Sequence, residues 1–270
     1  MDLLTIPSVV IAQQLTLIEF EHFSSIKPIE LTDHLWKKDP ARCANVSLFI
    51  NRFNECVYWV AGEILGRSTS LERSAMLCKF VRVAGHCKRL RNYHTLFAVS
   101  AGVTLFPVDR LKEMKNVFDR RHQRIFDSIQ TTSSTDDNYH HYRKLFDQCV
   151  EQNVACIPHL AVSLKDLFLL ELPTQTERSS GLVDMNRLAS VTENIDRILV
   201  CTKRSPVLTE HKDSLPQTSK LAKDNRKEQS GDVQTGHEAE QQRELSEFRA
   251  SLWQQMNVPR DHEFLLEVSL

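Results

Sequence analysis

Residues 156–172 read CIPHLAVSLKDLFLLEL, and this stretch decides the fold of the chain. Pro158 fixes a backbone angle that suits the first turn of a helix, and Pro173 forbids continuation, so the stretch predicts one helix bounded by prolines. One face of that helix carries leucines at the i, i+4, i+7 spacing of a buried stripe: Leu160, Leu164 and Leu167.

The end of this predicted helix is apolar on nearly every side. Between Leu167 and Leu172 the only polar residue is Glu171, whereas a helix resting on a core needs one apolar face. Phe168 and Leu172 are i, i+4 neighbours and are expected to lie together. Two interpretations follow from the pattern: a helix buried on all sides, or a helix end that projects into a partner.

The rest of the chain repeats the helical pattern. Apolar residues recur every three or four positions, strand-type alternation is nearly absent, and only 7 glycines are available for tight turns. The sequence therefore predicts an all-α domain, with a polar loop at 131–138. Helices are expected at 8–20, within 21–38, and at 45–65, 70–90, 93–103, 111–129, 139–150 and 184–200.

The composition changes at residues 203–242, which contain no aromatic residue and few aliphatic ones. Such a stretch buries too little apolar area to offset its backbone entropy, so we expect a disordered insertion that a short linker can replace. Residues 1–202 would then form the main part of the domain. Residues 243–270, with ELSEFRASLWQQM and DHEFLLEVSL, would complete it.

Charge and cysteine content exclude several functional classes. The formal net charge of −1 gives no reason to expect nucleic acid as a partner, and no run of eighteen apolar residues predicts insertion into a membrane. Seven cysteines without a CxxC motif are typical of a protein in a reducing compartment, and the first residues lack a signal-peptide pattern. We expect a cytoplasmic protein.

Motifs for bond chemistry are missing. The sequence contains no glycine-rich phosphate loop, no HExxH and no GxSxG, and the adjacent His140 and His141 point to different sides of a helix. We therefore expect no metal, no cofactor and no enzymatic bond making. The chain is predicted to act by binding.

Six blocks of the chain carry a resemblance when they are taken in order: 11–31, 49–65, 71–114, 137–149, 156–167 and 261–270. Together they resemble the catalytic domain of Ras-type guanine-nucleotide exchange factors, the RasGEF family. The run from RLKEM to VDMNRLASVTENI looks most like the Ras guanyl-releasing proteins, whereas KPIELTDHLWKK is more similar to the son-of-sevenless and Ral-exchange branches.

The resemblance implies a bowl-shaped all-α domain that grips the switch II segment of a small GTPase. Residues 159–172 and 184–200 would form a projecting helical hairpin that pries switch I from the nucleotide. The implied partner is a Ras-family GTPase of the Ras or Rap type. The implied alternative is a relative that has lost exchange and serves as a scaffold. The family usually has an additional N-terminal helical domain that supports the hairpin, and we expect that domain to be missing from this chain.

The resemblance also implies site residues on the hairpin. Phe168 matches the apolar residue that fills the magnesium site, and Leu172 matches the residue that crowds the α-phosphate. Many relatives carry a glutamate where this chain has Leu172, so only steric occlusion is expected from it.

The switch II pocket would consist of Phe97, Tyr139 and His159, with Arg73 and Thr104 also at the switch II surface. His159 stands where an aromatic or aliphatic residue is usual, and Thr104 where some relatives have asparagine; both differences, together with Leu172, favour the scaffold alternative. Because a histidine ordinarily titrates near neutral pH, His159 is expected to make binding pH-dependent.

One further position matches a family residue with a bracing role. Asn92 corresponds to the asparagine that precedes the central helix of the family's domain. We expect it to brace the fold. Arg73 could equally serve as a brace.

Overall fold

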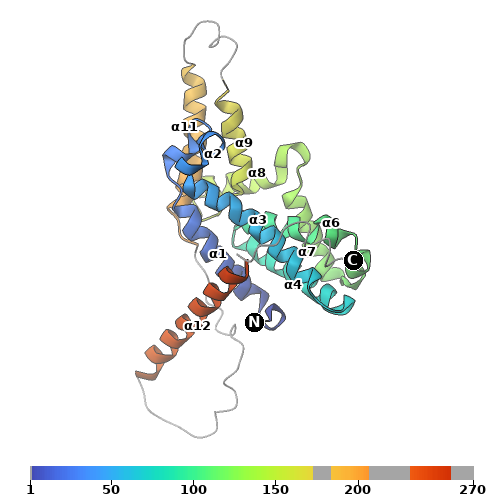
Figure 1. The fold of residues 1–270 in the computed structure, drawn as a ribbon. Coiled ribbons are helices and arrows are strands. Elements are labelled where there is room, and N and C mark those ends of the chain that lie inside the picture. The colour runs from blue at the N-terminus through green and yellow to red at the C-terminus, as the bar shows by residue number, and fades with distance from the viewer. Residues whose placement is uncertain (1, 173–183, 207–231, 257–270) are drawn as a thin grey trace.

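The computed structural model describes residues 2–172, 184–206 and 232–256 (Figure 1). Within these ranges every regular element is a helix, and the one β-type contact is an isolated bridge between Asn92 and Ile157, so the all-α prediction is confirmed. The helices are η1 (Leu3–Thr5), α1 (Ser8–Ser24), η2 (Pro28–Leu31), α2 (Leu35–Lys38), η3 (Pro40–Arg42), α3 (Ala44–Leu65), α4 (Ser70–Arg89), α5 (Tyr93–Val103), α6 (Phe106–Asp109), η4 (Lys112–Val117), α7 (Arg120–Ser133), α8 (Asp136–Glu151), α9 (Leu160–Leu170), α11 (Met185–Thr202) and α12 (Asp232–Met256).

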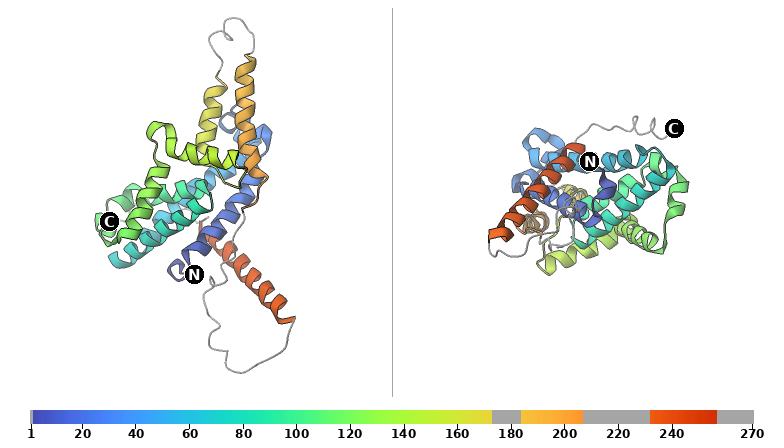
Figure 2. Two further views of the ribbon diagram at one scale, coloured as in Figure 1. Left: turned by 180° about the vertical axis from the view of Figure 1, so that it is seen from behind. Right: turned by 90° about the horizontal axis from the view of Figure 1, so that it is seen from below.

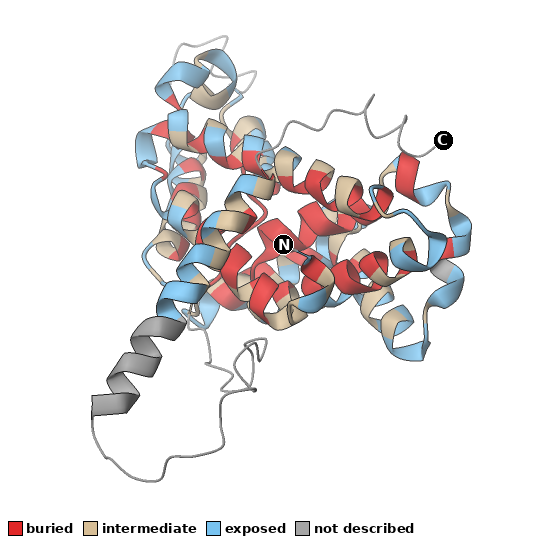
Figure 3. Ribbon diagram, turned by 60° about the horizontal axis from the view of Figure 1, so that its bottom comes forward, coloured by how far each residue is buried: buried red, intermediate tan, exposed pale blue. Residues whose placement is uncertain are grey.

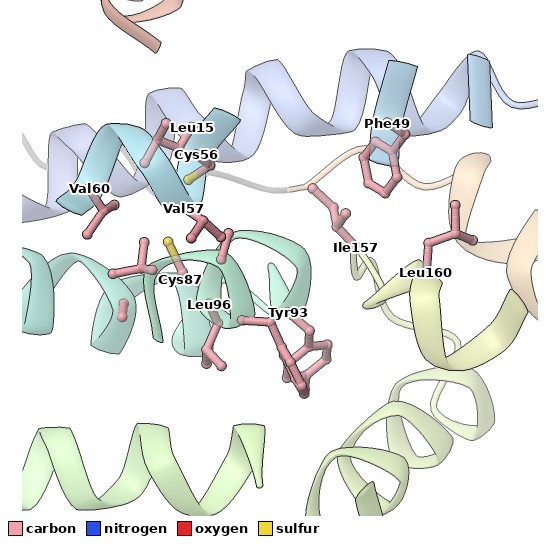
Figure 4. Packing of buried hydrophobic residues seen from close by; sticks show 14 of the residues in the cluster. Leu15, Phe49, Cys56, Val57, Val60, Cys87, Tyr93, Leu96, Ile157 and Leu160 are labelled. Carbon is pink, nitrogen blue, oxygen red and sulfur yellow. The ribbon is translucent and has the colours of Figure 1, made fainter. Parts of the chain in front are cut away.

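The interior of the molecule lies between α1, α3, α4 and α5. Most of the buried hydrophobic residues belong to these helices, and Figure 3 shows the buried residues gathered in the middle of the molecule. Figure 4 shows Leu15, Cys56 and Cys87 meeting where α1, α3 and α4 pack. The approach of α5 to α3 requires a glycine, because a Cβ atom at Gly102 would lie 2.7 Å from the Cβ of Val60. This close packing fixes α5 beneath the site described below.

The long central helices begin and end close to where the apolar pattern predicted. Thr69 and Glu72 form a capping box at the start of α4, in which each side chain binds the other residue's backbone N–H. Asn92 starts α5 by accepting a hydrogen bond from the backbone N–H of Thr95. Strong local caps at these positions explain the agreement.

The expected helix within 21–38 is wrong. After α1 ends at Ser24, only the four-residue helices η2 and α2 form in this range. Asp33 and His34 between them have φ of 54° and 53°, in the left-handed region that ends a right-handed helix. The polar sequence around these residues was compatible with a helix, so its pattern did not reveal the turn.

The expected helix at 111–129 is also wrong, and the expected loop at 131–138 is wrong in its first part. Asp119 accepts hydrogen bonds from the backbone N–H groups of Arg121 and His122, so a new helix, α7, starts at Arg120 and runs to Ser133. Helix α7 therefore takes up residues 131–133 of the expected loop. Residues 137–139 of α8 have left-handed backbone angles, so the right-handed part of α8 starts only after Tyr139, close to the predicted start.

Helices α9 and α11 lie side by side and stand out from the rest of the molecule (Figures 1 and 2). Helix α9 begins at Leu160 and not at residue 156, because the backbone of Ile157 is paired with Arg91 and Tyr93. Leu167 is buried, but Leu169 is 56% exposed and Leu172 is 41% exposed. The interpretation of a helix buried on all sides is therefore wrong.

Helix α12 begins at Asp232, inside the stretch expected to be a disordered insertion, of which 207–231 lies outside the described residues. The sequence HEAEQQREL is rich in good helix formers, and a helix can extend without an apolar face of its own when its far end is anchored. Near that end Leu252 and Met256 are buried, and Trp253 stacks on His22 of α1. Along the described ranges, no helix is both long and apolar enough to cross a bilayer.

Candidate functional site

A cluster of aromatic rings lies at the foot of the α9–α11 hairpin. The ring of His159 stacks on Phe97 of α5, with centroids 4.1 Å apart and an angle of 13° between the planes. Phe53 of α3 approaches His159 to 5.2 Å, and the backbone N–H of His159 donates to the hydroxyl oxygen of Tyr142 at 2.9 Å. The structure thus brings together the predicted Phe97 and His159, while Phe53 and Tyr142 were not foreseen.

His159 belongs to the floor of this cluster. Its exposure is 7% and that of Phe97 is 6%, and burial lowers the pKa of the imidazole from 6.5 to about 4. His159 is therefore neutral between pH 6 and 8. The expectation that its titration makes binding pH-dependent near neutrality is wrong, because desolvation moves the titration to acid pH.

A second buried histidine extends the cluster into the core. His94 of α5 stacks on Phe49 with centroids 3.8 Å apart, and its ring lies 6.4 Å from that of His159. Burial first, and then the neighbouring His159 and Arg52, hold the pKa of His94 well below its ordinary value.

An ion pair lies next to His94. The guanidinium of Arg52 on α3 binds the carboxylate of Glu19 on α1 at 2.9 Å, and both side chains are almost fully buried. Burial raises the pKa of Glu19 while Arg52 opposes the rise. The sequence contains a signal for this ion pair: both charged residues lie among the apolar residues of a predicted helix, where burying an unpaired charge would cost free energy.

Tyr139 sits beside the cluster in an unusual backbone. Residues 137–139 have φ between 47° and 64°, which introduces a left-handed turn at the start of α8. The ring of Tyr139 lies 6.1 Å from Phe97, and the ammonium of Lys165 lies 6.0 Å from its centroid. Tyr139 is half-buried, so it forms part of the accessible wall above the buried floor.

The turn that carries Tyr139 is tied to α9 by charged contacts. Arg143 binds both carboxylate oxygens of Asp166, at 2.6 and 2.8 Å, and its Nε–H donates to the backbone carbonyl of Asn138. Lys165 donates to the side-chain oxygen of Asn138 at 3.0 Å. Bidentate geometry of this kind orients the two helices as well as attracting them.

The end of α9 is packed differently on its two sides. Phe168 is half-buried: the ring of His34 lies 4.7 Å from it and the ammonium of Lys37 lies 4.3 Å from its centroid. Leu172 is 41% exposed among the described residues. Phe168 and Leu172 were expected to lie together inside a partner. In the free chain they differ in exposure, because the η2–α2 segment covers the ring of Phe168 and leaves Leu172 exposed.

The three remaining predicted residues make contacts within the fold. Asn92 is fully buried and, besides capping α5, donates to the hydroxyl oxygen of Thr16 on α1. The Nε–H of Arg73 donates to the backbone carbonyl of Arg67 at 2.8 Å, and the hydroxyl of Thr104 donates to the carbonyl of Ser100. For Arg73 the observed contact joins the first turn of α4 to the connection that follows α3, as a bracing role requires.

A comparison with protein-family models matches the RasGEF domain to residues 10–189, a range that runs from α1 into α11. The chain belongs to the RasGEF family. The match includes the aromatic cluster, the left-handed turn before Tyr139 and the whole of α9. Among the described residues, no group of histidine, cysteine, aspartate or glutamate side chains is arranged to hold a metal ion.

Similar curated proteins are exchange factors of Dictyostelium discoideum. Ras guanine nucleotide exchange factor J is 36% identical over 174 residues, which cover 63% of this RasGEF chain and 21% of the relative. Factor A is 35% identical over 164 residues (60% and 26%), and factor R is 29% identical over 197 residues (72% and 11%). The chain thus spans about a quarter or less of the length of these relatives. The closer likeness to Ras guanyl-releasing proteins stays a prediction.

Proposed function

We propose that this chain promotes the release of GDP from a Ras-family small GTPase. The match of the RasGEF domain to residues 10–189 carries the proposal, and the relatives named as Ras guanine nucleotide exchange factors support it. A GTPase of the Ras or Rap type is the proposed substrate. We also infer that residues 1–202, together with the C-terminal part of the chain, act as one exchange domain.

The energetic problem that an exchange factor solves is large. A GTPase that holds its nucleotide with nanomolar to picomolar affinity binds it by roughly −12 to −16 kcal/mol. The exchange factor must therefore bind the nucleotide-free GTPase about as strongly. Because binding free energies are linked, factor and nucleotide then weaken each other to the same extent. Apolar burial is the main source of such binding, at about 25 cal/mol per Å².

The geometry offers two surfaces for this task. In the first, Tyr139 would contact the switch II segment above the floor formed by Phe97 and His159. In the second, the exposed side of the α9 end, with Leu169 and Leu172, would enter the GTPase beside the nucleotide. Phe168 would fill the Mg²⁺ site, and Leu172 would crowd the α-phosphate sterically, because a carbon side chain cannot compete with phosphate as a carboxylate does. GDP without its Mg²⁺ would then leave because its phosphate charge is no longer compensated.

Release of a fluorescent GDP analogue from Ras, Rap and Ral proteins tests the proposal. We expect faster release from at least one of the first two when the purified chain is added. Binding of the same GTPases should be measured in parallel. A folded chain that binds a Ras-family GTPase but accelerates release from none would refute exchange and favour a scaffold that has lost activity.

A further inference from the structure

The carboxylate of Glu171 is bound by a segment far away in the sequence. One of its oxygens accepts a hydrogen bond from the backbone N–H of Asp33, and the other accepts one from the N–H of His34, each at 3.0 Å. The Nε2 atom of His34 also lies 2.8 Å from the carboxylate. The side chain of Glu171 is only 11% exposed, so these contacts replace most of its hydration.

The conformation of this segment depends on the carboxylate. Asp33 and His34 both have left-handed φ angles, which cost free energy for residues other than glycine. Neighbouring residues in such a turn direct their N–H groups to one side and form a concave site for an anion. Glu171 fills this site, so the strained turn and the end of α9 stabilise each other.

The same segment forms a wall next to Phe168. His34 contacts both the carboxylate of Glu171 and the ring of Phe168, and Lys37 lies over that ring from the following helix. Figure 1 shows α2 beside the α9–α11 pair, on the part that stands out from the body. Loss of the carboxylate would release the last turn of α9 and the wall against Phe168 together.

We propose that Glu171 is a positioning residue, which holds the end of α9 and Phe168 in the orientation for exchange by binding the backbone of Asp33 and His34. This inference rests on the proposed function. Glu171 itself would not touch the nucleotide or its Mg²⁺, because its oxygens are already engaged inside the chain.

Two substitutions at Glu171 test the role. Glu171→Ala removes both acceptors, whereas Glu171→Gln keeps the length and one acceptor oxygen but loses the charge. In the free protein, hydrogen exchange at residues 32–38 should be fastest in Glu171→Ala, intermediate in Glu171→Gln and slowest in the wild type. Glu151→Gln, at an exposed carboxylate at the end of α8, is the matched control and should resemble the wild type.

The same proteins are then compared in GDP release and GTPase binding. Glu171→Ala should slow release about tenfold while GTPase affinity stays unchanged, since a small misplacement of a working group can cost up to roughly 100-fold in rate. Glu171→Gln should lie between. Unchanged release of GDP in Glu171→Ala would overturn the inference. Faster release would overturn it as well, because residues 32–38 would then act as a cover that hinders Phe168.

The outcomes separate the inference from the function on which it rests. A wild-type chain that releases no GDP from any GTPase refutes the exchange function and the positioning role together. A wild-type chain that is active, with Glu171→Ala equally active, refutes the positioning role alone. Hydrogen exchange shows in both cases whether the contact itself exists in solution.

Discussion

The substitution His159→Phe should make the chain less sensitive to acid. The pKa of His159 is about 4 in the folded chain, against an ordinary value of 6.5 in the unfolded chain, because burial disfavours the charged form of the imidazole. Below pH 6.5 His159 becomes protonated in the unfolded chain, whereas in the folded chain it becomes protonated only near pH 4. The free energy of unfolding therefore decreases as the pH falls from about 6.5 towards 4. Above about pH 6.5 His159 causes no such loss.

The size of the effect follows from the two pKa values. Between pH 7 and pH 5 the proton uptake at this one position costs the folded state about 2 kcal/mol, using about 1.4 kcal/mol per pKa unit. Phenylalanine has no proton to take up and can keep the stack on Phe97. His94 remains in both proteins, and its pKa is lowered mainly by burial, which the substitution keeps; His159 is a lesser cause, and neutral His159 carries no charge at these pH values, so the contribution of His94 is nearly the same in both proteins.

Urea unfolding at pH 7 and pH 5 measures the difference. The wild type should lose about 2 kcal/mol more than His159→Phe over this interval, whatever the absolute stability of the variant at pH 7. His141→Gln, on the exposed side of α8, is the control and should retain the loss of the wild type. Equal losses in the wild type and in His159→Phe would show that burial does not hold His159 neutral. The assignment of His159 to the buried base of the aromatic cluster would then be wrong.

Three further substitutions probe the rest of the site. Phe168→Ala combined with Leu172→Ala should cut GDP release at least tenfold, about 1.4 kcal/mol, while GTPase binding persists; equal loss of thermal stability and release would indicate a purely structural role. Arg143→Lys should destabilise by roughly 1–2 kcal/mol in urea unfolding, because lysine cannot make the bidentate contact that supports the turn before Tyr139. Arg52→Met should cost roughly 3–5 kcal/mol, measured in the same way, because it leaves a buried carboxylate without its cation.

The periodic apolar pattern was enough to predict the fold class and the main helices. Residues such as Val46, Phe49 and Val60 repeat at three and four positions, and all are fully buried on α3. The resemblance to a family also named Phe97 and His159 together, and their rings are stacked in the structure, while their role at switch II stays a prediction. The protonation of His159 could not be predicted, since a pKa depends on how completely other elements exclude water, and those elements are far away in the sequence.

The turn at Asp33 and His34 shows where sequence reasoning ended. No glycine marks it, and its left-handed backbone is stabilised by a carboxylate that lies 138 and 137 residues away along the chain. One signal was nevertheless present, because Glu171 is the only polar residue in an otherwise apolar helix end. A lone carboxylate among apolar side chains needs hydrogen-bond donors close by, and within its own helix turn the N–H groups are already used. The donors had to come from another segment, so the polar exception in the pattern indicated a contact that the apolar residues could not.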